Sequence, residues 1–256
     1  MDAKEITRRI CAGVLNALDT KRLLFGIEGD STNNPELRPE YITTIEVAKS
    51  LTDIDHDVCV EAPMKDLRAI ALIFSMLNEQ PGEVREEIRA KYLFGKKDSK
   101  RLDVLVMPGG VTGLPLLMVE AKLSVGNFSG IKKDIDRLIR IFDMFSEVGA
   151  FKPGRTLYAA AVFHEWIEGS DGGRASEAGA RTVADIKSYL CTVQHGRPWL
   201  YTNAALLDTA ALIVPAVTYV ESYPDDTYEE VLTRKSLTFL PGLVLMGISP
   251  DVSDAF

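Results

Sequence analysis

Cysteine and histidine are scarce in this sequence, which has only three of each among its 256 residues. Cys11, Cys59 and Cys191 are odd in number and far apart, so they form neither a zinc-ligand spacing nor a disulfide framework. The scattered histidines argue against a histidine-rich metal site. We therefore expect a reducing, cytoplasmic setting.

Long apolar runs are also missing. The longest candidate, residues 204–220, is interrupted by Asp208 and Pro215. It falls short of the roughly 20 apolar residues that a membrane span needs. The first ten residues are charged and lack the apolar core of a signal peptide. The sequence contains no phosphate-binding glycine loop and no internal repeat, and we expect no membrane partner.

An excess of basic residues is the third absence, because the formal net charge is −8. This acidic balance counts against nucleic-acid binding, since phosphates attract basic surfaces. Residues 91–101 are an exception, with five basic residues and one acid, and they are either a substrate path or a solvated hairpin tip. The apolar content of 46% is enough for a sizeable core and predicts a single domain over residues 1–256.

What the chain does have is a distinctive stretch at residues 101–123. Two apolar runs rich in valine and leucine, residues 102–107 and 116–123, are each bounded by glycine or proline and predict two strands. The connection holds three glycines and two prolines, which is typical of a hairpin with a wide turn.

The predicted hairpin brings charged residues together. If it turns near Val111, Asp103 falls opposite Val119 or Glu120. Side chains alternate along a strand, so Glu120 and Lys122 point to the same face. Two carboxylates and an ammonium group would then share one small site at the end of an apolar ribbon.

Carboxylates that lie close together repel each other, and a divalent cation relieves that repulsion. Oxygen ligands favour Mg²⁺ or Mn²⁺ over zinc. Such a metal lowers the pKa of a bound water and stabilises charge on a phosphoryl group. A lysine beside it can orient the water or neutralise the developing charge.

Asp103 on one strand, followed by Glu120, Ala121 and Lys122 on the next, resembles the PD-(D/E)XK nuclease superfamily, also called restriction-endonuclease-like. The resemblance covers roughly residues 39–164, and Leu102 stands where many members have proline. It implies an α/β fold with a mixed central sheet flanked by helices, one helix before the sheet and one between the third and fourth strands. It also implies Mg²⁺-dependent cleavage of nucleic acid, most often DNA.

The resemblance also implies roles for these residues. Asp103 and Glu120 would hold the metal, often together with the backbone carbonyl of Ala121, and Lys122 would position or activate the attacking water. The superfamily usually adds an acid on the first helix, which we expect near residues 40–51. Of Glu40 and Glu46 we favour Glu40, because it projects within the apolar arc of that helix.

Other interpretations of these acids stay open. Glu40 can instead be a helix-start acid that interacts with the helix dipole. Glu61, on an expected strand at residues 57–63, is a weaker third candidate. Asp103 can be a solvated acid near the turn. Glu120 with Lys122 can be a surface pair worth less than about 1 kcal/mol.

The remaining elements are predicted from periodicity. Residues 88–94 alternate and predict a strand that pairs with the Asp103 strand. Residues 129–145 predict a helix whose basic stripe, including Lys133 and Arg137, either contacts phosphate or is a solvated face paired with neighbouring acids. Helices are also expected at 5–18, 67–77, 177–192 and 228–232, and strands at 157–163, 211–219 and 237–246.

The expected organisation is a core at about residues 39–164, with an N-terminal helix in residues 1–25 and a C-terminal part, residues 174–256, appended. That part could complete the core, form a homodimer surface or set substrate choice. The sequence therefore predicts a metal-dependent nuclease. The alternatives are a catalytically inactive nuclease-like domain that acts as a binding or assembly module, and a metal-dependent phosphohydrolase for small phosphate esters.

Overall fold

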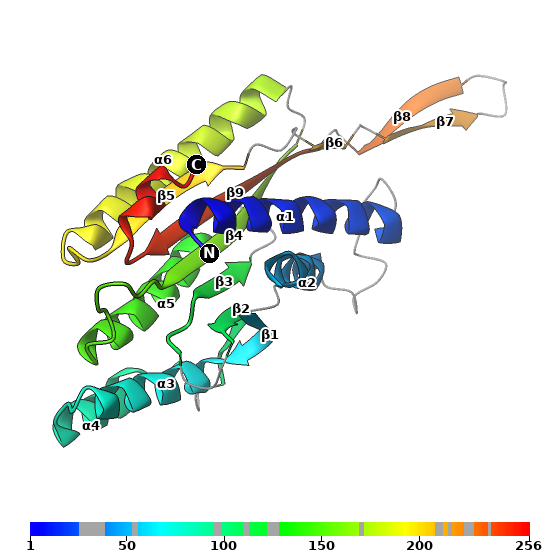
Figure 1. Cartoon of the computed structure of the whole chain (residues 1–256). Helices are drawn as coiled ribbons and strands as arrows, with labels where there is room; N and C mark the ends of the chain where they lie inside the picture. The colour runs from blue at the N-terminus through cyan, green and yellow to red at the C-terminus, as the bar shows by residue number, and fades with distance from the viewer. Residues whose placement is uncertain are drawn as a thin grey trace.

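The computed structural model describes residues 1–25, 39–52, 56–94, 99–109, 113–121, 128–168, 172–207, 212–214, 217–222, 228–234 and 237–256. Within these ranges the chain is an α/β protein, in which six α-helices flank a mixed open sheet (Figure 1). The helices are α1 (Ala3–Phe25), α2 (Pro39–Leu51), α3 (Met64–Leu77), α4 (Gly82–Lys91), α5 (Phe128–Glu147) and α6 (Gly172–Gln194), with a short 3₁₀ helix, η3 (Pro250–Asp254), near the C-terminus.

Six strands lie side by side in the central sheet, in the order β1-β2-β3-β4-β9-β5, and β6 also pairs with β9. The neighbours β3 and β4 are parallel and the other pairs are antiparallel. A separate two-stranded sheet is formed by β7 and β8. The strands are β1 (His56–Pro63), β2 (Arg101–Pro108), β3 (Leu117–Ala121), β4 (Tyr158–Glu168), β5 (Tyr201–Leu206), β6 (Leu212–Val214), β7 (Val217–Ser222), β8 (Tyr228–Arg234) and β9 (Leu237–Gly247).

The parallel pair β3 and β4 explains where α5 lies. Parallel neighbours need a crossover connection, and here the chain passes through α5 between them. The face of α5 that packs on the sheet carries apolar residues at helical spacing, all of them buried: Ile131, Ile135, Leu138, Phe142 and Phe145. This packing fixes α5 beside the end of β3.

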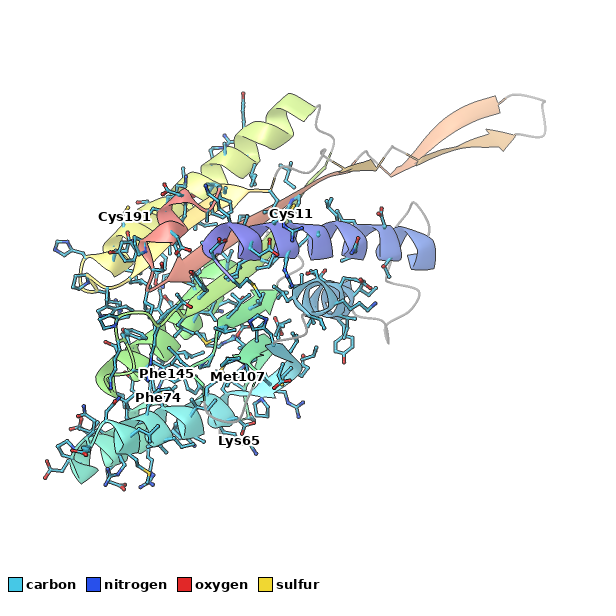
Figure 2. All side chains as sticks on the ribbon, viewed as in Figure 1. Cys11, Lys65, Phe74, Met107, Phe145 and Cys191 are labelled. Carbon is cyan, nitrogen blue, oxygen red and sulfur yellow. The ribbon has the colours of Figure 1, made fainter. Side chains whose placement is uncertain are left out.

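The sheet separates two hydrophobic cores, because successive residues of a buried strand point to opposite faces. On β3, Met118 belongs to the core that also holds residues of α3, α4, α5 and α6, whereas Val119 belongs to the core that holds residues of α1 and α2. Phe74 from α3 and Phe145 from α5 both belong to the first core (Figure 2). The α2 and α5 helices therefore cover opposite faces of the sheet.

The C-terminal part of the chain builds much of the sheet. The β9 strand pairs with β4 along the whole of Tyr158–Glu168 and with β5 on its other side. The segment that the sequence places outside the core thus contributes β5, β6 and β9 to the central sheet. Strand β5 was not predicted, because its residues show no clear alternation.

Two element predictions are wrong. Residues 88–91 close helix α4, and residues 92–94 are not in a strand. The apparent alternation there comes from Ile88 and Tyr92, which are buried one helical turn apart, and the free edge of β2 is taken by β1. Residues 228–232 form strand β8, not a helix, because they pair with β7.

Within the residues that the structure describes, no helix is both long and apolar enough to cross a bilayer.

Candidate active site

The β2–β3 hairpin sets the register of the two predicted metal ligands. Val104 pairs with Val119 in this antiparallel ladder, so one step further along Asp103 lies opposite Glu120. The sequence-based register, which allowed Val119 or Glu120 as the partner, is therefore confirmed. The hairpin brings two acids that are 17 residues apart in sequence to the same end of the ladder.

Asp103 is fixed by a bond to the partner strand. Its Oδ2 atom accepts a hydrogen bond from the backbone N–H of Ala121 at 2.6 Å. The last backbone pair of the β2–β3 ladder at this end is Val104 with Val119. The N–H of Ala121 lies beyond that pair and is bonded by the Asp103 side chain instead. A hydrogen bond to a charged acceptor is stronger than a neutral one, so it holds the carboxylate at the end of the strand.

Glu120 is almost fully buried, with 4% of its side chain exposed, and its partner comes from α5. Arg137 Nη1 donates to Glu120 Oε1 at 2.6 Å, and Nη2 lies 3.1 Å from Oδ1 of the buried Asp134. Burial raises the pKa of Glu120 to about 8, and the charges of Asp103 and Asp134 also raise it, while Arg137 opposes them. The ionised form of Glu120 would therefore gain from a second cation.

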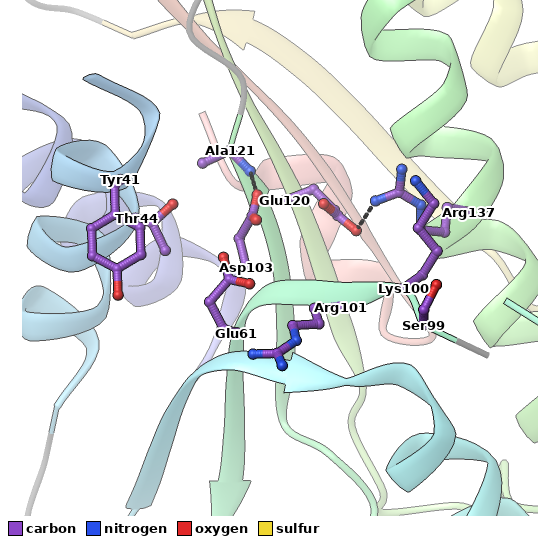
Figure 3. A pocket seen from close by; sticks show the side chains of 10 residues that line it. All are labelled: Tyr41, Thr44, Glu61, Ser99, Lys100, Arg101, Asp103, Glu120, Ala121 and Arg137. Carbon is purple, nitrogen blue, oxygen red and sulfur yellow. Dashed lines mark hydrogen bonds and ion pairs between the residues drawn. The ribbon is translucent and has the colours of Figure 1, made fainter. Parts of the chain in front are cut away.

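The two acids open into a pocket of about 370 Å³ at this end of the sheet (Figure 3). Helix α2 forms one wall and Arg137 of α5 lies on the opposite side. Exposed Lys100 and Arg101 lie at the start of β2. The lining residues are Tyr41, Thr44, Glu61, Ser99, Lys100, Arg101, Asp103, Glu120, Ala121 and Arg137.

Glu61 enters the pocket through an unusual backbone conformation. Its neighbours Val60 and Ala62 pair with Val104 and Leu102, so Glu61 lies opposite Asp103 but has no ladder partner. Its φ angle is +56°, in the left-handed region that costs a residue other than glycine on the order of 1 kcal/mol. Strain of this kind often marks functional positions, and it places a third carboxylate in the pocket wall.

The helix acid and the lysine are described less completely. Glu40 lies in the first turn of α2, four residues before the pocket residue Thr44, but its side chain is outside the described residues. Lys122, which follows Ala121 directly, also lies outside them. Glu46 pairs with Lys49 at 2.8 Å and does not line the pocket.

Arg137 is the residue whose role the sequence did not reveal. The basic stripe on α5 was open to interpretation as a solvated face, but Arg137 is only 22% exposed and contacts two buried acids. A signal existed, because Ile141 lies one turn later on the same helix face and is buried. Lys132 instead follows the solvated interpretation and pairs with Asp136 at 2.6 Å.

The described acids suit a metal that keeps much of its water. In the ranges covered by the structure, no group of three histidine, cysteine, aspartate or glutamate side chains is close enough to hold a metal ion. Asp103, Glu120 and the carbonyl of Ala121 would supply oxygen donors only. Mg²⁺ is commonly bound through one or two carboxylates while it keeps several waters, so this donor set fits Mg²⁺.

Comparisons with known proteins add no relative. Neither a scan against protein-family models nor searches of the curated proteins and of the solved structures found a match.

Proposed function

We propose that this protein is a metal-dependent nuclease of the PD-(D/E)XK type, with a restriction-endonuclease-like core. The observation that carries the proposal is the convergence of Asp103 and Glu120 in one pocket at the end of the β2–β3 hairpin. Burial of a charge inside an apolar strand is costly, so a buried acid beside a second acid requires a compensating positive charge. Cation binding supplies one.

The order of elements also supports the proposal. The chain runs from α2 through β1, β2 and β3 into α5 and then β4, with α3 and α4 inserted between the first two strands. A helix before the sheet, a helix between the third and fourth strands and a mixed sheet are the features that the resemblance implies. Glu120 lies at the end of the third strand and Asp103 near the start of the second, an arrangement that agrees with the resemblance.

The residues divide the chemistry between them. Asp103, Glu120 and the carbonyl of Ala121 would hold Mg²⁺ or Mn²⁺. The metal, when bound, would lower the pKa of a water and stabilise charge on the phosphoryl group. Lys122 would orient the attacking water, and Glu40 would support a ligand or a second metal. Lys100 and Arg101, which are exposed at the pocket, would neutralise the substrate phosphate.

Cleavage assays test the proposal. Plasmid DNA, single-stranded DNA and RNA are incubated with Mg²⁺ or Mn²⁺, and we expect cleavage of at least one of them. Asp103→Asn, Glu120→Gln and Lys122→Ala should each lower the rate by at least about a hundredfold while thermal unfolding remains cooperative. Glu40→Gln should also lower it, whereas Glu46→Gln, on the same helix but paired with Lys49, serves as the matched control. If the first three variants cut like wild type, the assignment is wrong.

A second candidate function rests on the ion pair of Arg137 with Glu120. This pair already gives the buried carboxylate a cation within the protein. A catalytically inactive nuclease-like domain that acts as a binding or assembly module would need such a cation, because it holds no metal. The acidic net charge of −8 is compatible with that role. It predicts a stable partner or oligomer, and no metal-dependent cleavage under any of the assay conditions above.

A further inference from the structure

A second cavity, of about 260 Å³, adjoins the candidate active site. The two cavities share the side chains of Lys100 and Arg137, so they are neighbours around one wall. The second one contains no residue from β1, β3 or α2. Its lining is Phe94, Lys100, Lys133, Asp136, Arg137 and Arg140.

The lining of this second cavity is strongly cationic. Four of its six residues are lysine or arginine and one is an acid. The acid, Asp136, is already held by Lys132 at 2.6 Å and accepts a hydrogen bond from the hydroxyl of Tyr189. Its charge is therefore compensated by Lys132, which does not line the cavity. Among the described residues, the cavity cation that forms ion pairs with carboxylates is Arg137.

Two lysines of this cavity are available for a ligand. Lys100 and Lys133 are exposed, and within the described ranges neither side chain forms an ion pair with a carboxylate. Arg140 is oriented, because its guanidinium lies over the rings of Tyr92 and Phe94, at 5.7 Å and 5.2 Å from their centroids. It also donates a hydrogen bond to the carbonyl of Lys91. A fixed arginine with two free lysines is suited to an anion with several acceptor oxygens.

We propose that this cavity binds a backbone phosphate of a nucleic acid strand, next to the phosphate that lies at Asp103 and Glu120. The identity of the ligand rests on the proposed nuclease function. A small phosphate ester has one phosphate and would leave the second cavity empty, whereas a polynucleotide presents phosphates in series. Phosphate binding in both cavities would therefore require a polynucleotide substrate, and a contact of this kind to the backbone carries no sequence information.

Salt dependence of binding measures this contact. A fluorescein-labelled single-stranded DNA of about 16 nucleotides is titrated with protein by fluorescence anisotropy, in chelator and between about 50 and 200 mM salt. The slope of log K against log salt is negative, and Lys133→Ala should reduce its magnitude by about 0.7, the contribution of one phosphate contact. Lys133→Glu should weaken binding at least about tenfold. Lys187→Ala and Lys187→Glu, at an exposed lysine on α6, are the matched controls.

The outcomes separate this inference from the proposed function, since cleavage with Mn²⁺ is measured on the same preparations. Cleavage by wild type together with Lys133 variants that bind like the Lys187 variants overturns the subsite and leaves the nuclease in place. A reduced slope without any cleavage supports the subsite and overturns the nuclease. Failure of wild type to bind the labelled DNA, and an RNA of the same sequence titrated in the same way, overturns the subsite.

Discussion

Arg137 on α5 donates a hydrogen bond to the buried carboxylate of Glu120 on β3 at 2.6 Å, and this contact joins a helix to the end of a central strand. The pair lies where a cation would be needed if Glu120 is ionised. Arg137 is also held by the buried Asp134, so the guanidinium compensates two acids at once. Removal of the arginine would leave both without their nearest positive charge.

Arg137→Met should destabilise the protein by about 3 kcal/mol, because it leaves buried acids without a partner. Urea unfolding followed by circular dichroism measures the change. The double variant with Glu120→Gln should recover part of the loss, with a coupling energy of at least about 1 kcal/mol. Strictly additive effects of the two substitutions would contradict a direct interaction.

Metal binding should depend on the two hairpin acids. Calorimetric titration with Mn²⁺ is expected to give binding to the wild type and none to the variant with both Asp103→Ala and Glu120→Ala. A variant with both Glu46→Ala and Asp254→Ala loses the same charge outside the pocket and should bind like wild type. Chelator should stop cleavage, and added Mg²⁺ should restore it. Equal binding to all three proteins would remove the proposed ligands from consideration.

Gly13 should control the position of the helix that walls the pocket. A Cβ atom added there would lie 2.6 Å from Cα of Val47 and 2.9 Å from the carbonyl oxygen of Glu46, both in α2. Backbone cannot yield as a flexible side chain can, so Gly13→Ala must push α1 and α2 apart. We expect a loss of about 1–3 kcal/mol and a lower cleavage rate, since α2 also carries Thr44.

The control for this substitution is Gly196→Ala, because nothing lies within 4 Å of a Cβ atom at that position. Urea unfolding and the cleavage assay are run on both variants. A Gly13→Ala protein as stable as the Gly196→Ala protein would mean that the two helices are not in such close contact.

Asp251 should make stability depend on pH. Its Oδ2 accepts hydrogen bonds from the backbone N–H of Ala3 and from the hydroxyl of Tyr158, both at 2.9 Å, which ties η3 to α1 and β4. Burial alone would raise the pKa of Asp251, but hydrogen bonds from Ser249, Ala3 and Tyr158 outweigh it and lower the pKa. Because the folded-state pKa is the lower one, the stabilisation is present above the unfolded-state pKa and is lost as pH falls through the folded-state value.

Asp251→Asn should therefore cost about 1 kcal/mol at neutral pH, and the difference from wild type should shrink below about pH 4. Thermal melts across this range measure both effects. Asp254→Asn, at an exposed position of the same 3₁₀ helix, should have little effect at any pH. A difference that stays constant as the pH falls would assign the effect to shape rather than to charge.

The residue pattern of positions 101–123 was enough to predict the β2–β3 hairpin and to place Asp103 opposite either Val119 or Glu120. The reason is local, because two apolar runs and the glycine- and proline-rich connection between them limit the register to within about one residue. The same local patterns predicted most helices, whose apolar residues recur every three to four positions.

The surroundings of those two acids depend on contacts between distant segments of the chain. Arg137 reaches Glu120 because α5 crosses between parallel strands, and Glu61 faces Asp103 because β1 takes the free edge of β2. The same long-range pairing placed β9 between β4 and β5 and made residues 228–232 a strand. Such contacts join segments far apart in the chain, and the residues of one strand alone do not predict which strand it pairs with.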